Sequence, residues 1–165
     1  MKDNSRKPVL VLGIGNILLS DEGIGIHIIN ELQNMPLPDD IEVIDGGTAG
    51  ADLLDILAER RKVIIIDAIQ TDSPPGTVLK FTLDDIMPSE NNAISMHDLG
   101  IPETLHMAKM IGFAPKETVF FGIKPQNLGC GLDLSEALQK QIPSIINLIL
   151  EETGVRNMSI YKVLH

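Results

Sequence analysis

Short aliphatic runs alternate along this chain with longer segments in which apolar residues recur at helical spacing. The runs of Val, Ile and Leu predict β-strands at 9–14, 41–44, 63–66 and 118–123. The segments between them place apolar side chains three and four positions apart, as one face of a helix does. They predict helices over about 22–34, 51–60, 96–111 and 133–152. Strands that alternate with helices in this way are typical of an α/β fold with a largely parallel sheet.

Three local features refine this pattern. Residues 77–83 alternate apolar and polar side chains, as a strand with one wet face does, and no helix separates them from the strand at 63–66. We therefore expect an edge strand here, antiparallel to its neighbour. Ser95 is predicted to cap the helix over 96–111, and Pro143 is predicted to kink the last helix.

The chain is organised around its first strand-to-helix connection, which carries Gly13, Gly15, Asn16, Asp21 and Glu22. The glycines let the backbone turn where a side chain would collide. The two acids follow at the expected start of a helix, where the helix dipole favours negative charge. One interpretation is that they only cap this helix. The other is that a carboxylate is held at the carboxyl edge of a parallel sheet, where open α/β folds place their sites.

Two further residues are expected at the same edge. Asp67 closes the strand over 63–66, and His97 opens the helix that follows the edge strand. If the strands at 9–14 and 63–66 are parallel neighbours, Glu22 lies near Asp67, and His97 can join them. Two carboxylates and one imidazole are the open three-ligand set that a catalytic divalent metal needs. The alternative is that each acid caps or pairs locally and that His97 is a surface residue.

Other polar residues are weaker candidates for a catalytic or metal-binding role. Asp45, in a second glycine-rich turn, can support the edge as a hydrogen-bond acceptor or can simply form the turn. His27 lies off the helical face of Glu22 and is expected to pack or to face solvent. Cys130 stands between glycines without an obvious activating base, so a structural or incidental role is expected.

The first connection also resembles the start of a dinucleotide-binding fingerprint, because Gly13 and Gly15 follow a strand. However, Leu18 stands where the third glycine belongs. Asp21 and Glu22 would also repel a pyrophosphate at the helix start. A nucleotide-dependent α/β enzyme is therefore kept as an alternative to a metal site.

The chain of 165 residues fits a single domain, predicted over 1–165, with flexible tails at 1–7 and about 155–165. Its net charge of −10 argues against nucleic acid or an anionic membrane as a partner, since both attract cationic surfaces. No apolar run approaches the ~20 residues of a membrane span, and 1–7 lacks the apolar core of a secretory signal. A single cysteine favours a reducing compartment, and we expect a cytoplasmic location.

Five sequence blocks stand out, in order, over nearly the whole chain. They are GIGNILLSDEGIG at 13–25, DGGTAG at 45–50, IIIDAI at 64–69, ISMHDLG at 94–100 and FGIKP at 121–125. Together they resemble the nickel–iron hydrogenase maturation endopeptidases. The GN-x-L-x-x-D-E-x-x-G pattern in the first block is specific, and the DGGT and His-containing blocks reinforce it.

The resemblance implies a three-layer α/β/α sandwich with a five-stranded mixed sheet, one strand of which is antiparallel. It implies an aspartic-type endopeptidase that removes a C-terminal extension from the hydrogenase large-subunit precursor once nickel is in place. The metal-contacting residues of the family fall on Glu22, Asp67 and His97, the same trio that the topology suggests. A metal held there would polarise the scissile carbonyl and lower the pKa of a bound water.

Nickel is the metal that the resemblance implies, either seated in the precursor or bound by the enzyme in the complex. An oxygen-rich trio does not select nickel over other divalent metals by affinity alone. Asn16, Asp21 and Asp45 are expected to support the trio or to belong to a loop that meets the substrate. Besides the nucleotide-dependent enzyme, two alternatives stay open: a close relative that acts on other hydrogenases, and a chaperone that binds the precursor without cleaving it.

Overall fold

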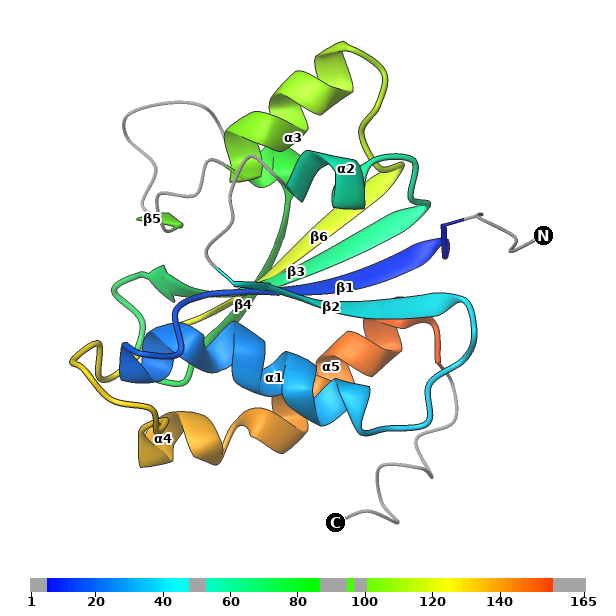
Figure 1. Ribbon diagram of the computed structural model, residues 1–165. Helices are drawn as coiled ribbons and strands as arrows, with labels where there is room; N and C mark the ends of the chain where they lie inside the picture. Colours follow the sequence, from blue (N-terminus) through cyan, green and yellow to red (C-terminus); the bar gives the residue numbers. More distant parts are fainter. Residues whose placement is uncertain (1–5, 48–52, 87–94, 97–100, 156–165) are drawn as a thin grey trace.

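The computed structural model describes residues 6–47, 53–86, 95–96 and 101–155, and it shows a mixed β-sheet between two layers of helices (Figure 1). Five strands pair side by side in the order β2-β1-β3-β6-β4. Of these five, β4 at the edge is the antiparallel one. Their bounds are β1 Val9–Ile14, β2 Ile41–Gly47, β3 Lys62–Gln70, β4 Val78–Thr82 and β6 Glu117–Ile123. This arrangement confirms the predicted three-layer α/β/α fold with its antiparallel edge strand.

Helices cover both faces of this sheet (Figure 1). One layer contains α1 (Ile24–Gln33), α4 (Glu136–Gln139) and α5 (Ile142–Thr153), and the other contains α2 (Leu54–Leu57) and α3 (Ile101–Met110). Successive side chains of a strand point to opposite faces, so β1 contributes to two separate cores. Val9 and Val11 belong to the core under α1 and α5, whereas Leu10 and Leu12 belong to the core under α2 and α3.

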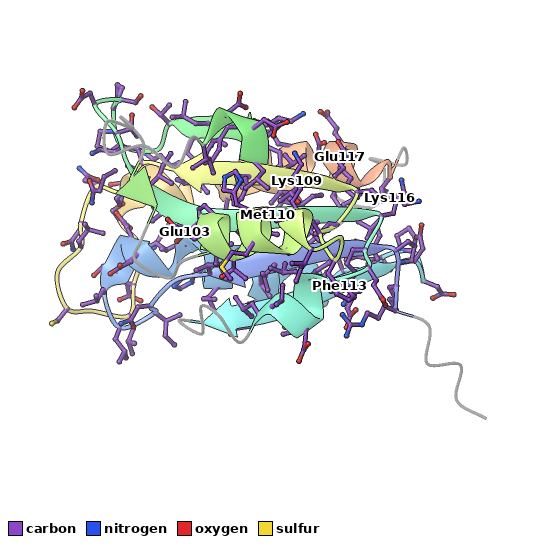
Figure 2. The ribbon with its side chains drawn as sticks, turned by 90° about the horizontal axis from the view of Figure 1, so that it is seen from above. Glu103, Lys109, Met110, Phe113, Lys116 and Glu117 are labelled. Carbon is purple, nitrogen blue, oxygen red and sulfur yellow. The ribbon has the colours of Figure 1, made fainter. Side chains whose placement is uncertain are left out.

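The outer side of α3 is exposed, as the view from above shows (Figure 2). Ile101 and Leu105 of this helix are buried against the sheet. Glu103 and Lys109 face solvent, and Met110 is 86% exposed. The polar residues of α3 therefore lie on the opposite side of the sheet from α1.

Parallel pairing of β1 with both of its neighbours brings three strand ends to one edge of the sheet. Val9 pairs with Ile41 of β2 and with Lys62 of β3. At the other end of β1, Gly13 pairs with Ile66 of β3. The connections that follow these strands therefore begin side by side, as expected for a site at the carboxyl edge of an α/β sheet.

The strand predicted over 63–66 is longer than expected, because β3 continues to Gln70. Asp67 therefore does not close the strand but lies within it, paired with Gly122 of β6. The strand is prolonged because β6 runs alongside it and because a two-residue strand, β5 (Ser95–Met96), pairs antiparallel with its last residues.

The helix predicted over 96–111 corresponds to α3, which is described over Ile101–Met110, and residues 97–100 lie outside the described residues. Ser95 does not cap it, because Ser95 belongs to β5. Pro102 follows in the first helical turn, where the missing N–H of a proline costs no intrahelical hydrogen bond.

The last predicted helix is divided into two. α4 ends at Gln139 and α5 starts at Ile142, so Pro143 does not kink a continuous helix but stands in the first turn of the second one. The helix predicted to start at 22 begins as a 3₁₀ turn, η1 (Ser20–Gly23), and α2 occupies only part of the helix predicted over 51–60.

The predicted tails at 1–7 and 155–165 lie mostly outside the described residues. Within the first, the guanidinium of Arg6 donates a hydrogen bond to the carbonyl oxygen of Ala58 at 3.1 Å. None of the helices in the described part of the chain combines the length and the apolar character that crossing a membrane requires.

Candidate functional site

Glycines at the end of β1 determine where Glu22 lies. Gly15 has a φ of +144°, and a Cβ added there would collide with the carbonyl oxygen of Glu22. Gly25, near the start of α1, packs in the same close manner against the carbonyl oxygens of Ile14 and Ile66. These contacts hold η1 and the start of α1 directly on β1 and β3. Glu22 is thereby carried to the carboxyl end of the sheet.

Asp67 is a buried acid at the carboxyl end of β3, with 2% of its surface exposed. Burial raises the pKa of its carboxyl group well above the ordinary value. The backbone N–H of Ala68 donates to Oδ1 at 2.8 Å and partly opposes this rise. The negative charge of Glu22 raises the pKa further. The structure thus brings Glu22 and Asp67 near each other, although they are distant in the sequence.

Two neighbouring carboxyl groups make this edge receptive to positive charge. Asp67 is buried and Glu22 is half-buried, so water screens their repulsion less than it would at the surface. Such a pair lowers its free energy by holding a proton or by binding a cation. Carboxylate oxygens are suitable ligands for divalent metal ions, and an added imidazole extends the range to nickel and zinc.

His97, the third residue of the predicted trio, lies outside the described residues, so its place relative to the two acids stays a prediction. Within the described residues alone, no three His, Cys, Asp or Glu side chains come close enough to hold a metal ion. Of the predicted trio, the structure therefore describes the two acids Glu22 and Asp67.

Residues 26–152 match the sequence model of a family described as hydrogenase maturation protease. This chain belongs to that family. A hydrogenase 2 maturation protease from Escherichia coli is 38% identical over 152 residues, which cover 89% of this chain and 93% of the relative. A putative hydrogenase maturation protease from Methanocaldococcus jannaschii is 33% identical over 156 residues, which cover 89% of this chain and 97% of the relative.

Solved structures of the family share the fold of this maturation protease. The hydrogenase maturating endopeptidase HybD from Escherichia coli superposes with a TM-score of 0.77 at 35% identity, covering 88% of this chain and 93% of HybD. The NiFe hydrogenase maturation protease HycI from Thermococcus kodakarensis gives a TM-score of 0.71 over 90% of this chain and 93% of HycI. Its identity is 20%, so this second likeness supports the fold alone.

In this maturation protease Asp21, next to Glu22, has a different environment. Asp21 is fully buried, and its carboxylate accepts backbone N–H groups from Gln126 and Asn127, both at 2.9 Å, and from Ser135 at 2.7 Å. Burial raises the pKa of Asp21, but these hydrogen bonds outweigh it and leave the pKa below the ordinary value. A carboxylate held by three N–H groups acts as a structural acceptor.

The loop that Asp21 holds, residues 126–135, is fastened to η1 at further points. Ser20 Oγ donates to the carbonyl oxygen of Gly129 at 2.8 Å, and the backbone N–H of Ser20 donates to that of Gly131 at 2.9 Å. The 126–135 loop therefore forms a fixed wall beside the turn that carries Glu22. Sequence patterns place Asp21 near the site but do not reveal these partners, which lie 105 to 114 positions further along the chain.

Asn16 and Asp45 both form local turns. The side-chain oxygen of Asn16 accepts the N–H of Leu18 at 2.9 Å, and that of Asp45 accepts the N–H of Gly47 at 2.8 Å. For Asp45 the structure therefore shows the turn-forming role. Both residues also line a hollow of about 330 Å³ where β1 and β2 end.

The other His and Cys side chains of the described residues, those of His106, Cys130 and His27, each have a separate environment. A ring nitrogen of His106 lies 3.1 Å from the carbonyl oxygen of Ile86, and Cys130 is exposed on the 126–135 loop. His27, expected to pack or to face solvent, is half-buried at a pocket between α1 and α4. No sequence pattern indicates this pocket, because its two walls come from segments more than 100 positions apart.

Proposed function

We propose that this maturation protease removes the C-terminal extension of a nickel–iron hydrogenase large-subunit precursor after nickel insertion. In this proposal Glu22, Asp67 and His97 contact the metal. Membership of the family supports the class of reaction, and the names of its relatives refer to hydrogenases. The single cysteine is in keeping with a reducing compartment, and we assign the step to the cytoplasm.

The observation that carries the proposal is the position of Asp67, which is buried in β3 at the carboxyl end of the sheet, close to Glu22. Burial and the nearby charge both favour a proton on Asp67, so the pair is poised to exchange that proton for a cation. Two carboxylates therefore fit a divalent metal, and the imidazole of His97 would provide the third ligand. When bound, such a metal polarises a peptide carbonyl and lowers the pKa of a water molecule.

The residues of the chain then have distinct tasks. Asp67 and Glu22 attract and orient the positive centre of the nickel-loaded precursor. Gly15 and Gly25 keep Glu22 against the sheet, and Asp21 keeps the 126–135 loop in place beside it. A precursor without nickel would lack the group that these acids recognise, so it would not dock productively. The proposal applies to nickel carried by the precursor and to nickel bound in the complex.

The test is incubation of the enzyme with nickel-loaded and nickel-free precursor, followed by intact-mass measurement of the precursor. We expect the loaded precursor to lose its C-terminal extension and the empty one to stay intact. The variants Asp67→Asn and His97→Ala should leave both precursors uncut, while Asp39→Asn, an exposed acid in the α1–β2 connection, serves as the control. Normal cleavage by Asp67→Asn and His97→Ala would refute the assignment of the site.

The same experiment distinguishes a chaperone from a protease, and a thermal-shift screen tests for a nucleotide-dependent enzyme. A chaperone that only binds the precursor would form a complex without any change in precursor mass. A nucleotide-dependent enzyme would show an upward thermal shift with NAD or ATP, which the acids beside the glycine loop argue against.

A further inference from the structure

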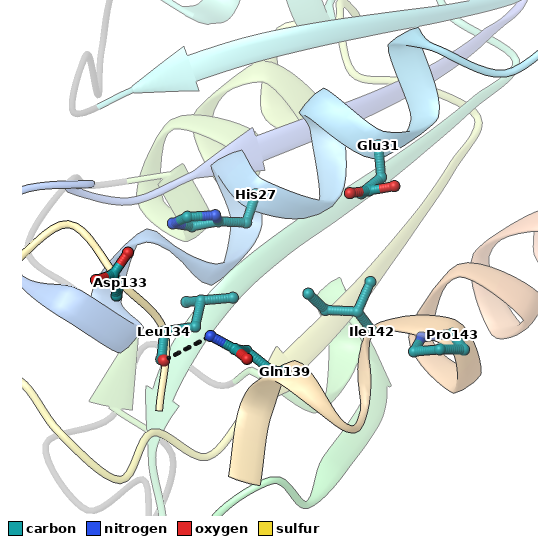
Figure 3. Close-up of a pocket in the computed structure, with 7 residues that line it drawn as sticks. All are labelled: His27, Glu31, Asp133, Leu134, Gln139, Ile142 and Pro143. Atoms are coloured by element: carbon teal, nitrogen blue, oxygen red, sulfur yellow. Dashed lines mark hydrogen bonds between the residues drawn. The ribbon is translucent and has the colours of Figure 1, made fainter. Parts of the chain in front are cut away.

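A pocket of about 450 Å³ lies between α1 and the segment that contains α4 and the start of α5 (Figure 3). This volume is within the range of roughly 300–1,000 Å³ that pockets for small ligands occupy. The helix α1 begins directly after the turn that carries Glu22, and Asp133 belongs to the loop that Asp21 holds. The α1–α4 pocket is therefore built from the same elements as the candidate active site, on the outer side of α1.

The polar residues around this pocket are rich in hydrogen-bond acceptors. Glu31 and Asp133 are exposed, and neither forms an ion pair with a Lys or Arg of the described residues. Gln139 donates its Nε2 to the carbonyl oxygen of Leu134 at 3.1 Å, the dashed line in Figure 3, and this leaves its amide oxygen as an acceptor.

His27 adds an unmet hydrogen-bonding group to the same pocket. Figure 3 shows its imidazole extending from α1 above Asp133 and Leu134. Its Nε2 atom is buried and has no hydrogen-bond partner within the described part of the chain. His27 and Glu31 are four positions apart on α1, so they share one face of the helix. An unpaired buried nitrogen is costly, and a donor from a ligand would remove that cost once the imidazole turns to expose the nitrogen to the pocket.

The rest of the pocket is apolar. Leu134 is 7% exposed, and Ile142 and Pro143 continue the apolar lining on the same side of the pocket (Figure 3). An apolar wall below a rim of acceptors suits a ligand that has an aliphatic stem and a head rich in donors. An arginine side chain has this composition, with a methylene stem and five N–H donors on a planar cation.

We propose that the α1–α4 pocket binds an arginine side chain presented by a protein partner. Glu31 and Asp133 provide the opposite charge, Gln139 and His27 provide further acceptors, and the apolar wall covers the stem. The identity of the partner as the hydrogenase precursor rests on the proposed function, whereas the chemistry of the pocket does not. In that complex the pocket would anchor the precursor on the outer side of the helix that carries Glu22 at its start.

The first experiment tests the pocket with small probes. Nα-acetyl-arginine amide and its neutral isostere, Nα-acetyl-citrulline amide, are titrated into ¹⁵N-labelled enzyme and followed by NMR at the amides of His27 and Leu134. We expect saturable shifts with arginine, with a Kd on the order of 1 mM because a single side chain contributes little surface. Citrulline, which lacks the charge, should bind about tenfold more weakly or not at all. Equal shifts with both probes, or none at these amides, would overturn the proposal.

A pair of matched variants strengthens this test. Glu31→Gln combined with Asp133→Asn removes both charges and should abolish the preference for arginine over citrulline. Glu103→Gln makes the same kind of change on the exposed face of α3, on the other side of the sheet (Figure 2), and should leave the preference unchanged. A preference that survives in the double variant would show that these acids do not recognise the guanidinium.

The second experiment uses the nickel-loaded precursor. The Glu31→Gln, Asp133→Asn double variant should raise KM by about tenfold, the loss expected for one charge-assisted contact, and the effect should fall on KM rather than on kcat. An unchanged KM would overturn the role of the pocket in precursor binding. If the wild-type enzyme cleaves no precursor, the proposed function fails, and the arginine and citrulline titrations still decide what the pocket binds.

Discussion

Asp67 in β3 lies close to Glu22 in the turn after β1, and its pKa is raised first by burial and further by the charge of Glu22. This relationship is unfavourable for the folded state at neutral pH, because a buried carboxyl group and a neighbouring acid repel each other when both are ionised. Stabilising alternatives at such a position are easily found by substitution, and active sites are the usual place where unfavourable arrangements persist. The pair is therefore better explained by function than by stability.

Replacement of Asp67 by Asn should separate these two roles. We expect Asp67→Asn to lose processing activity but to unfold at a higher denaturant concentration than the wild type at pH 7, because an amide avoids the cost of either ionising the buried carboxyl group or keeping a proton on it. The folded-state pKa of Asp67 is raised, so its stabilising contribution is complete below the unfolded-state pKa of ~4 and is lost as pH rises through the folded-state value. The advantage of the variant should accordingly grow with pH.

The measurement is urea unfolding from pH 4 to pH 8 with a chelator present. Asp72→Asn, at an exposed aspartate after β3, is the control and should show no such trend. A variant at position 67 that is less stable than the wild type at every pH would show that Asp67 is a structural residue.

Gly15→Ala should impair both stability and activity. The added Cβ would collide with the carbonyl oxygen of Glu22, and the φ of +144° is strained for any residue with a side chain. Gly112→Ala is the matched control, because Gly112 also has a positive φ, of +80°, but nothing lies within 4 Å of its Cβ position. Strain alone costs about 1–3 kcal/mol.

Unfolding and processing assays distinguish the two glycine variants. Both should lose stability, but only Gly15→Ala should lose processing, since only that substitution displaces Glu22. Equal processing by both variants would mean that the position of Glu22 does not matter for cleavage.

The neighbours Asp21 and Glu22 should respond oppositely to neutralisation. Asp21→Asn places an amide N–H₂ where backbone N–H groups already point, so we expect it to cost about 2–4 kcal/mol of unfolding free energy. Hydrogen exchange at the amides of Gln126 and Ser135 should accelerate with it. Glu22→Gln, one position along, should keep the stability and the protected amides but lose processing. Matching losses of stability in both variants would contradict this division of roles.

The sequence predicts which segments form strands and helices better than it predicts where each of them begins and ends. Aliphatic runs such as 9–14 identify the buried strands, and the alternation over 77–83 identifies the edge strand. The end of a strand depends on its partners, however, and β3 continues past Asp67 because β5 and β6 accompany it. Ser95 resembles a helix cap in sequence, but pairing with β3 decides its conformation.

The candidate site could likewise be predicted only in part. Parallel strand order is enough to bring Glu22 and Asp67 to one edge, so their proximity follows from topology. The role of Asp21 could not be inferred, because its hydrogen-bond donors come from a loop more than 100 positions away. The α1–α4 pocket was likewise hidden, since Glu31 and Asp133 are polar residues without any motif around them.

Glu152 provides a pH-dependent test of how α5 is attached to the sheet. Its carboxylate lies 2.6 Å from the Nζ atoms of both Lys62 and Lys80, and it is only 13% exposed. Burial raises the pKa of Glu152, but the hydrogen bonds and charges of the two lysines outweigh it and lower the pKa overall. The stabilisation is therefore complete above the unfolded-state pKa of ~4.3 and is lost as pH falls through the lower folded-state value.

We expect Glu152→Gln to lower the unfolding free energy at pH 7 by about 1–2 kcal/mol, because the largely buried charge-assisted hydrogen bond with Lys62 is weakened, while the bond with the exposed Lys80 contributes little. The difference from the wild type should shrink as pH falls below 4, where the wild-type carboxylate also becomes neutral. Glu151→Gln, at the exposed neighbouring position, is the control and should stay within 0.5 kcal/mol of the wild type, roughly the range of ordinary surface substitutions. A difference for Glu152→Gln that is constant between pH 3 and pH 7 would mean that its charge does not hold α5 to the sheet.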